Sequence, residues 1–577
     1  MTLELQIPRS ATLREIVEFI RKKGIETSYE LIPELEGHIL FELVLSPDTL
    51  KKAVTGIRVS GFNTPNGCTQ ALANGWQCWS ESPILKSNET LFQDVKADRK
   101  VFGDAEFYPY AEKPGQFHSW GYSYGNSEKS DGAPFWGSLT EFTAHSAFEF
   151  QLGEGTFGIF VDTEGLSTEK EITLKWILPN PEAQKYAPLT QSQAIWIQKL
   201  TNTQSVPTVN QNKIFGYTSW YYTYTDISED LLKQRLNAIK SQEAPWEVFQ
   251  VDDGFSTAIG DWITTKYNFP GGMDGVARAA KKSGKKPGLW CAPFIACENS
   301  QVFREHPEYF LKDIDGKMVL CGNQPLWGGK FYALDTEQPE VKKHLESVVQ
   351  TYFQKWGFSF LKADFIYATS RVATGGLSRA QRGRNAMLWL WEMCQKYDVT
   401  LLACGSILST SVGVCDYCRV GADVDLFFTP QENPQWDLST PMREIPSTVG
   451  TLTNTITRST LNGLSFGNDP DVFILRDEAQ HMTHEQRKVI YDVNKLFGNL
   501  LFCSDNPATF KDWQTDVMQQ KEPTVKIKET LSITKQQDNA YKILVKDFED
   551  KTKLITVNLT QSESMGTKPY SVLLEEI

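Results

Sequence analysis

The order of apolar and polar positions changes twice along the chain and divides it into three parts. In the first part, residues 1–208, short apolar runs such as 38–45 and 155–161 alternate with turns rich in Gly, Pro, Asn and Ser. A helical period is clear only at 11–23. Many short strands separated by turn residues are typical of a β-sandwich. We interpret the polar stretch 204–212 as a linker to the second part.

The second part alternates strand-like runs with amphipathic helices. Eight alternations over roughly 290 residues predict a (β/α)8 barrel, in which the residues after each strand meet on one face. A doubly wound sheet is the alternative, because a sequence does not show whether a sheet closes. The predicted strands are 214–220, 246–252, 286–293, 331–335, 358–364, 399–405, 417–423 and 463–467, and the clearest helices are 229–240, 273–282, 339–356 and 377–397.

The third part begins where the helical pattern stops, after about residue 510. Residues 540–545 and 553–559 alternate as strands do and predict a small β domain. We therefore expect a multidomain protein. Its domains are an N-terminal β-sandwich at 1–208, a catalytic (β/α)8 barrel of the TIM type at 209–510, and a C-terminal antiparallel β domain at 511–577.

The composition restricts the class of partner. The 577 residues carry a formal net charge of −13, which argues against a nucleic acid, because phosphate binding needs a basic surface. A neutral sugar is compatible with this charge, although solubility alone also explains it. The start of the chain has no basic stretch followed by an apolar run, and no run of about 18 apolar residues occurs. We expect a cytoplasmic protein without membrane contact, of unknown oligomeric state.

The cysteines and histidines do not indicate a metal. Ten cysteines are too sparse for a disulfide scaffold, so we expect reduced thiols. Cys415 and Cys418 form a lone CxxC inside an apolar run, which favours buried strand residues over a zinc site. The seven histidines form no HExxH, and the chain has no GxxxxGK[ST] loop. We expect no metal and no cofactor.

Two aspartates close two of the predicted strands and are the strongest candidates for chemistry. Asp364 ends 358–364 and Asp423 ends 417–423. A single strand-end aspartate is usually a helix cap, but two such residues on one barrel face suit glycoside hydrolysis. That reaction needs one carboxylate to attack or to activate water and one acid to protonate the leaving oxygen.

Nearby cations bear on the roles of these two acids. Lys362 lies two residues before Asp364, so both side chains point into the barrel, where a lysine needs a carboxylate partner. We expect this cation to keep Asp364 ionised, as a nucleophile must be. Arg419 lies four residues before Asp423, and a general acid has to be protonated at the working pH. Electrostatics alone leaves the assignment of the two roles open.

Other strand ends carry groups suited to a sugar. Asp252 and Asp253 close the second predicted strand, and two adjacent carboxylates accept hydrogen bonds from two adjacent hydroxyls. Adjacent acids next to Gly254 are also common in ordinary loops. Trp290 at the end of the third strand is equally suited to a pocket wall and to the core.

The ordered set of motifs resembles glycoside hydrolase family 36, the microbial α-galactosidases or melibiases. Each motif is weak by itself, and the specificity lies in their order, which covers the whole predicted barrel and reaches the first domain. The motifs are Phe215–Thr225, similar to the family's GYxxWYxY strand, then Gln250–Asp253, Gly260–Trp262, Phe269–Pro270, Lys286–Phe294, His306–Pro307, Tyr332–Asp335, Phe360–Phe365, Cys404–Ser406, Arg419–Asp423, Asn468–Asp471 and, in the first domain, Asn74–Ser80.

The resemblance implies a β-supersandwich, a (β/α)8 barrel and a C-terminal β domain. It also implies a retaining exo-α-galactosidase that works by double displacement without a cofactor on a small carbohydrate. The roles it implies are nucleophile for Asp364, acid/base for Asp423, binding of the C4 and C6 hydroxyls for Asp252 and Asp253, donation to ring hydroxyls for Lys362 and Arg419, contact with the C2 hydroxyl for Cys404 and Gly405, and pocket walls for Trp290, Trp220 and, from the sandwich, Trp79.

Three departures from the family pattern concern residues beside these motifs. Ala363 stands where Ile or Trp is usual, Ala422 where Pro is usual, and Gly254 where Ala or a larger residue is common. Both candidate catalytic carboxylates are kept. The alternatives are an α-N-acetylgalactosaminidase or galactosyl-transferring enzyme with the same carboxylate pair, a non-catalytic sugar-binding protein, and a metal-dependent barrel hydrolase.

Overall fold

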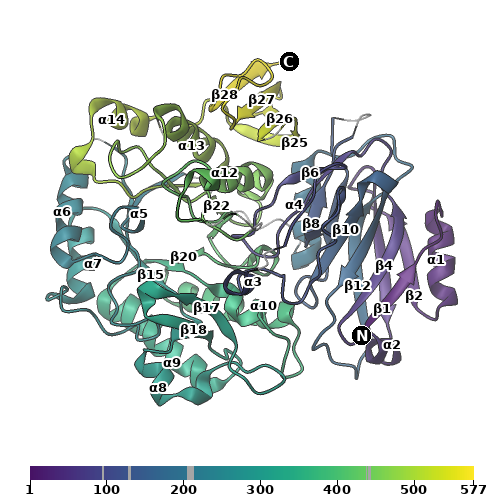
Figure 1. The fold of residues 1–577 in the computed structure, drawn as a ribbon, viewed down its shortest axis with the longest axis horizontal. Helices are drawn as coiled ribbons and strands as arrows, with labels where there is room; N and C mark the ends of the chain where they lie inside the picture. Colours follow the sequence, from purple (N-terminus) through teal and green to yellow (C-terminus); the bar gives the residue numbers. More distant parts are fainter. Residues whose placement is uncertain are drawn as a thin grey trace.

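A β-sandwich, a barrel and a small antiparallel sheet follow one another along the chain (Figure 1). The computed structural model describes residues 1–93, 96–127, 131–203, 213–242, 244–436, 438, 443–520, 522–537 and 539–577. The predicted linker at 204–212 lies outside these residues. In Figure 1 the sandwich lies at one side of the barrel, and the C-terminal sheet lies above the junction of the two.

The sandwich consists of two five-stranded sheets, as the short alternating runs predict. In the strand at 38–45, alternate residues such as Phe41 and Leu43 are buried between the sheets. One sheet has the order β1 (Thr2–Gln6), β4 (Gly56–Asn63), β11 (Thr156–Val161), β10 (Ser146–Gln151), β7 (Gln116–Trp120), and the other β2 (Glu26–Leu31), β3 (His38–Leu45), β12 (Ile172–Pro179), β9 (Phe135–Ser138), β8 (Tyr122–Tyr124). Outside these sheets lie α1 (Leu13–Lys22), α2 (Pro47–Lys52), α3 (Ala97–Lys100) and the pair β5 (Gln70–Leu72) and β6 (Ile84–Lys86).

The barrel is a curled, all-parallel sheet whose two end strands are consecutive in the chain. These end strands, β22 and β23, are separated by Pro470 and Asp471, so the sheet returns to its starting point. The order is β22 (Gly467–Asp469), β21 (Tyr417–Arg419), β20 (Thr400–Ala403), β19 (Phe360–Ala363), β15 (Lys286–Cys291), β14 (Val248–Val251), β13 (Ile214–Thr218), β24 (Leu500–Cys503), β23 (Val472–Phe473).

Helices cover the outside of the barrel, as the helical period predicts. Ser228 caps the helix at 229–240, its hydroxyl accepting from the Leu231 backbone N–H, and Leu232 and Leu236 face the core. The helices of this region are α5 (Trp220–Thr223), α6 (Glu229–Lys240), α7 (Gly272–Lys282), α8 (Gln301–Glu305), α9 (Pro339–Gln350), α10 (Arg379–Lys396), α11 (Leu408–Ser411), α12 (Thr448–Thr457), α13 (His484–Phe497) and α14 (Asp512–Gln519). One helix before the barrel, α4 (Leu189–Thr201), packs against β9 and against β25 (Ile527–Lys535) of the C-terminal sheet. The expectation that residues 1–208 contain a clear helix only at 11–23 is therefore wrong.

One strand prediction is wrong, and one strand of the barrel was not predicted. The run 331–335 does not join the barrel, because β18 (Gly329–Ala333) pairs antiparallel with β16 (Ile295–Cys297) and β17 (Leu320–Gln324) in an inserted three-stranded sheet. The barrel instead uses β24, a four-residue apolar run directly after α13 that the sequence analysis overlooked. Both errors arise because apolar runs of this length look alike in an insertion and in a barrel.

The C-terminal sheet is four-stranded and antiparallel, with the order β25 (Ile527–Lys535), β26 (Ala540–Asp547), β27 (Thr552–Asn558), β28 (Ser571–Glu576). The expectation that helices end near residue 510 is wrong, since α14 follows. The amide of Gln514 on this helix donates to the Leu475 carbonyl at 3.1 Å. The predicted fold class with three parts is confirmed. The domain boundaries at 208/209 and 510/511 remain a proposal. The contacts of α14 with the barrel favour placing the second boundary after this helix.

A buried arginine connects the sandwich to the barrel. Arg458 follows α12 and donates to the Cys78 carbonyl at 2.7 Å and to the Val420 carbonyl at 2.6 Å. Its Nε donates to Asn74 Oδ1 at 3.0 Å. These bonds fix the sandwich loop that carries Trp79 against the end of β21.

Among the helices that the structure describes, we find none long and apolar enough to cross a bilayer.

Candidate active site

A pocket of about 200 Å³ lies where the barrel strands end and the sandwich meets the barrel. The strands, although distant in sequence, deliver their C-terminal residues to this one place, as expected for a parallel barrel. Of the predicted site residues, those that line the pocket are Trp79, Trp220, Asp252, Asp253, Trp290, Lys362, Asp364 and Asp423. Cys404, Gly405 and Arg419 lie directly behind this wall and are not among its lining residues.

Asp364 is buried and held in one orientation. Its backbone N–H donates to the Cys291 carbonyl at 2.8 Å, which places the side chain at the end of β19. The carboxylate accepts from Trp290 Nε1 at 3.0 Å and from the Phe365 N–H at 2.9 Å. Burial raises the pKa of Asp364, and the Lys362 ammonium and the Trp290 hydrogen bond oppose this without cancelling it.

Lys362 is paired, but with a different carboxylate from the expected one. Its ammonium lies 2.9 Å from Asp252 Oδ2, and both side chains are almost fully buried. Burial opposes the charged form of Asp252, but Lys362 and the Gln250 amide outweigh it and lower the pKa of Asp252. The expectation that Lys362 mainly keeps Asp364 ionised is therefore corrected: Lys362 supports Asp252 first and Asp364 from a distance.

Asp253 faces the same pocket with a weaker partner. Its backbone N–H donates to Asp252 Oδ1 at 3.0 Å, and its Oδ2 accepts from Trp327 Nε1 at 2.7 Å. Burial raises the pKa of Asp253 to about 6; the Trp327 hydrogen bond lowers it and the neighbouring Asp252 charge raises it further. The two adjacent aspartates therefore differ: one is stabilised as an anion, and the other is easier to protonate.

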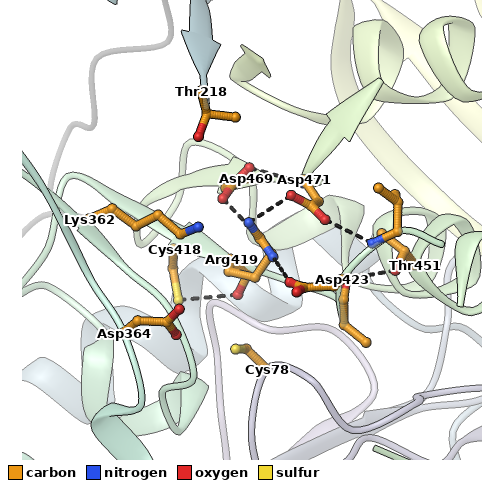
Figure 2. A network of polar contacts seen from close by, with 12 residues as sticks. Cys78, Thr218, Lys362, Asp364, Cys418, Arg419, Asp423, Thr451, Asp469 and Asp471 are labelled. Atoms are coloured by element: carbon orange, nitrogen blue, oxygen red, sulfur yellow. Dashed lines mark hydrogen bonds and ion pairs between the residues drawn. The ribbon is translucent and has the colours of Figure 1, made fainter. Parts of the chain in front are cut away.

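Asp423 lies on the open side of the pocket and belongs to a charged cluster (Figure 2). Its side chain is 38% exposed and accepts from Arg419 Nη1 at 2.9 Å. The same guanidinium lies 2.9 Å from Asp469 Oδ2 through Nε and 2.8 Å from Asp471 Oδ1 through Nη2. Figure 2 shows Arg419 at the centre of the three carboxylates, with Asp364 and Lys362 to one side.

The sandwich closes one wall of the site through Trp79. Gly405 has a left-handed backbone (φ +54°), and a Cβ there would lie 2.8 Å from Trp79 Cζ2 and 2.8 Å from the Phe365 nitrogen. Phe365 meets the Trp79 ring edge-on at 5.0 Å. Glycine is thus required at 405 both by conformation and by space. Cys404 is fully buried beside it, next to Cys78 of the sandwich.

Several residues of this site were not predicted from the sequence. Asp469 and Asp471 belong to a quoted motif but received no role, and their signal was the alternation of acids around Pro470 at a strand end. The others carry no local signal, because their place depends on how an inserted sheet and two loops fold over the barrel. They are Asn323, Gln324, Trp327 and Phe331 from the inserted sheet, Arg99 and Phe102 from the sandwich, and Glu444, Ile445 and Pro446 from the loop before α12.

The residues that the structure describes contain no group of three or more His, Cys, Asp or Glu side chains placed to hold a metal ion. Cys415 and Cys418 are both buried, as predicted, but only Cys418 lies in a strand, β21, and Cys415 precedes it. The side chains that line the pocket are carboxylates, the Lys362 ammonium, the Arg99 guanidinium, two amides and aromatic rings, with a few aliphatic residues.

Comparisons with known proteins agree with this geometry. The sequence model of the melibiase family matches residues 197–402. Over 226 residues, 38% of this chain, the sequence is 26% identical to α-galactosidase 2 of Pediococcus pentosaceus, of which it covers 28%. Over 157 residues, 26% of this chain, it is 28% identical to an A type blood α-D-galactosamine galactosaminidase of Flavonifractor plautii, of which it covers 14%. The chain thus spans less than a third of the length of either relative.

A solved structure extends the likeness of fold beyond the barrel. The α-galactosidase TtGalA of Thermus thermophilus, in complex with p-nitrophenyl α-D-galactopyranoside, superimposes with a TM-score of 0.68. The superposition covers 90% of this chain and 98% of TtGalA at 24% sequence identity. The arrangement of the domains is therefore shared with a protein whose structure is known.

Proposed function

Since this chain belongs to the melibiase family, glycoside hydrolase family 36, we propose that it is a retaining exo-α-galactosidase. It removes terminal α-linked galactose from oligosaccharides or glycoconjugates. The observation that carries the proposal is that Asp364 and Asp423, from the ends of two different barrel strands, line one pocket. Retaining glycosidases use two carboxyl groups on opposite sides of the scissile bond.

Asp364 is the nucleophile in this proposal. Its carboxylate is buried and held by Trp290 and the Phe365 N–H, which fixes it for attack on the anomeric carbon. Attack by the carboxylate oxygen forms the bond to C1 as the bond from C1 to the leaving oxygen breaks. Lys362 and the Trp290 hydrogen bond favour the ionised form that attack requires, against the cost of burial.

Asp423 is the acid and then the base. Its carboxyl is partly exposed at the pocket, and in this proposal the aglycone leaves and water enters on that side. In the first step it donates its proton to the leaving oxygen. In the second it takes a proton from water, whose oxygen attacks C1 and releases the Asp364 carboxylate. The C1 configuration is inverted twice and so retained.

Recognition of the sugar rests on the floor of the pocket. Asp252 and Asp253 offer adjacent acceptors for two hydroxyls, and the Lys362 ammonium offers a donor beside them. Trp220 and Trp290 supply apolar walls for the C–H faces of the ring. We also assign Cys404, Gly405 and Arg419 to this recognition, although they stand behind the wall and act through the residues in front of them.

The test is hydrolysis of a panel of aryl α- and β-glycosides, with NMR following the galactose anomer that is released first. We expect turnover of the α-galactoside only, with the α anomer appearing first. Release of the β anomer first would contradict a double displacement, and turnover of none of the α-galactosides would leave a sugar-binding role.

An α-N-acetylgalactosaminidase is the second candidate, favoured by the similarity to the galactosaminidase from Flavonifractor plautii. Comparing kcat/KM for p-nitrophenyl α-galactoside and its 2-acetamido analogue decides between the two. Transfer to an added acceptor sugar, followed in the same reactions, measures galactosyl transfer.

We propose that the protein acts in the cytoplasm. All ten cysteines are free and buried, which is compatible with a reducing compartment. Fractionation of the producing cells tests this, and activity found only outside the cytoplasm would contradict it.

A further inference from the structure

One positive charge in the active site is shared by three carboxylates. Arg419 contacts Asp423, Asp469 and Asp471 with three different nitrogen atoms, at 2.8 to 2.9 Å. If all three were ionised, the cluster would carry two negative charges in excess. Carboxylates this close disfavour each other's ionised form, so the cluster retains a proton more readily than isolated acids would.

Asp471 is the deepest member of the cluster. Its side chain is 1% exposed, against 3% for Asp469 and 38% for Asp423. The Val424 N–H donates to its Oδ2 at 2.8 Å, and the Tyr221 hydroxyl contacts the same oxygen. Its Oδ1 lies 2.8 Å from Arg419 Nη2 but out of line for a hydrogen bond, so this contact is an ion pair only.

The backbone fixes Asp471 in this place. It has a left-handed conformation with φ +69°, which residues other than Gly, Asn and Asp rarely adopt. Its backbone N–H donates to Asp469 Oδ1 at 2.9 Å. Because β22 and β23 meet here, the turn that closes the barrel also holds the carboxylate against Arg419.

We propose that Asp471 is a positioning residue that governs whether Asp423 carries a proton, because both carboxylates compete for the single charge of Arg419. When Asp471 is neutral, the guanidinium is free to stabilise the carboxylate of Asp423. When Asp471 is ionised, it takes up that charge, and Asp423 keeps its proton to higher pH. This role rests on the proposed function, in which Asp423 must first be an acid and then a base.

The charges around Asp471 agree with such a role. Burial raises the pKa of Asp471 to about 7. The charges of Asp423 and Asp469 also raise this pKa, whereas the cations Arg419 and Lys362 lower it. The groups that face it come from four parts of the barrel, namely Arg419 of β21 with Asp423 after it, Asp469 of β22, Lys362 of β19 and Tyr221 of α5. The raised pKa of Asp471 therefore agrees with a cluster that retains a proton.

The experiment is the pH profile of kcat/KM for wild type and Asp471→Asn. Asparagine tolerates the left-handed backbone and removes only the charge. The substrates are methyl α-galactoside, whose leaving group needs a proton, and p-nitrophenyl α-galactoside, whose leaving group needs little. We expect the alkaline limb to move to lower pH by about one unit with the methyl glycoside and much less with the aryl glycoside.

The matched control is Asp505→Asn. Asp505 is also fully buried and paired with an arginine, Arg476 at 2.7 Å, but it lies outside the cluster. Its loss is expected to lower the thermal midpoint without moving the pH profile. An Asp471→Asn profile that coincides with wild type, or an equal shift in Asp505→Asn, would overturn the proposal.

A second measurement does not depend on activity. Because the pKa of Asp471 is raised on folding, its contribution to stability is fully present below about pH 4 and is lost as the pH rises through about 7. Between pH 4 and 8 the thermal midpoint of Asp471→Asn is therefore expected to fall less steeply than that of wild type. If no α-galactoside is hydrolysed, the proposed function fails. The difference in slope between the thermal midpoints of wild type and Asp471→Asn still decides whether Asp471 holds the proton. Identical slopes would overturn the proposal that it does.

Discussion

The two sides of the pocket carry their charges in different ways. On the Asp364 side, one ammonium, Lys362, is paired with one carboxylate, Asp252, and both are buried. On the Asp423 side, one guanidinium, Arg419, faces three carboxylates, of which Asp423 is partly exposed. The first arrangement has a single favourable protonation state. In the second, three carboxylates compete for one cation.

This difference matches the demands of a double displacement. A nucleophile keeps one charge state until it attacks, and a balanced, buried ion pair beside it supports that state. An acid that later becomes a base has to lose and regain a proton in each turnover, which a cluster with too few cations allows. We infer that the barrel fixes the charge state of one catalytic carboxylate, Asp364, and leaves the charge state of the other, Asp423, adjustable.

Removing the carboxylate with the fixed charge state, Asp364, is expected to have the largest effect on this difference between the two sides. Asp364→Asn is expected to lower kcat on the order of 10⁵-fold, because the amide that replaces the carboxylate does not form the covalent intermediate. The thermal midpoint should stay at or above the wild-type value, since a buried charge is removed. Steady-state kinetics and thermal unfolding check both. A loss below tenfold would show that Asp364 is not the nucleophile.

Removing the adjustable carboxylate has a smaller and more selective effect. Asp423→Ala is expected to lower turnover of methyl α-galactoside by about 10² to 10⁴-fold, and that of aryl α-galactosides with good leaving groups less. Added azide needs no base, so it should attack the galactosyl enzyme, restore aryl turnover and give the α-galactosyl azide. The β-galactosyl azide, or equal losses on both substrates, would exclude the acid/base role.

Breaking the ion pair tests the balance on the Asp364 side. Lys362→Met leaves the Asp252 charge buried without its cation and is expected to cost about 3–5 kcal/mol in the free energy of unfolding. The double variant Lys362→Met/Asp252→Asn removes both charges and should regain much of this loss. Urea unfolding of the two single variants and the double variant gives the coupling energy. Additive losses would mean that the two charges do not support each other.

The weakest expected effect concerns Asp253, whose pKa burial raises to about 6. If its carboxylate binds the sugar, kcat/KM should fall as the pH drops through about 6. Trp327→Phe removes the indole N–H at 2.7 Å, which favours the anion, so this acidic limb should move to higher pH by about one unit. Profiles from pH 4 to 8 measure the shift, and Trp436→Phe, which removes an indole N–H from Asp425 outside the pocket lining, is the control. A shift to lower pH would contradict binding through the anion.

The features that could be predicted from the sequence are those whose signal lies within one short segment. The bounds of α6 agree with the helical period residue for residue, because a serine cap and an amphipathic face lie within that segment. The ends of β14 and β19 were placed within one residue, since each apolar run stops beside a carboxylate, whereas β21 ends at Arg419, four residues before the predicted end. The pocket residues on those strands followed from the rule that parallel strands end on one face.

What could not be predicted depends on pairing at a distance. The run 331–335 and β24 have the same kind of apolar pattern, and only the folded sheet distinguishes an insertion from a barrel strand. Lys362 was expected to serve Asp364, two residues away, but it turns to Asp252 on another strand. Trp327 and Glu444 enter the pocket from an insertion and a loop, and their sequence neighbours do not reveal this.

The most direct test of the central claim, that Asp364 and Asp423 act as a pair in one pocket, is to trap the covalent intermediate. Incubation with a fluorinated α-galactosyl fluoride, followed by peptide mass spectrometry, should place one fluorogalactosyl group on Asp364 in wild type and in Asp423→Asn, and none in Asp364→Asn. A label on any other side chain of an active enzyme would contradict the pairing.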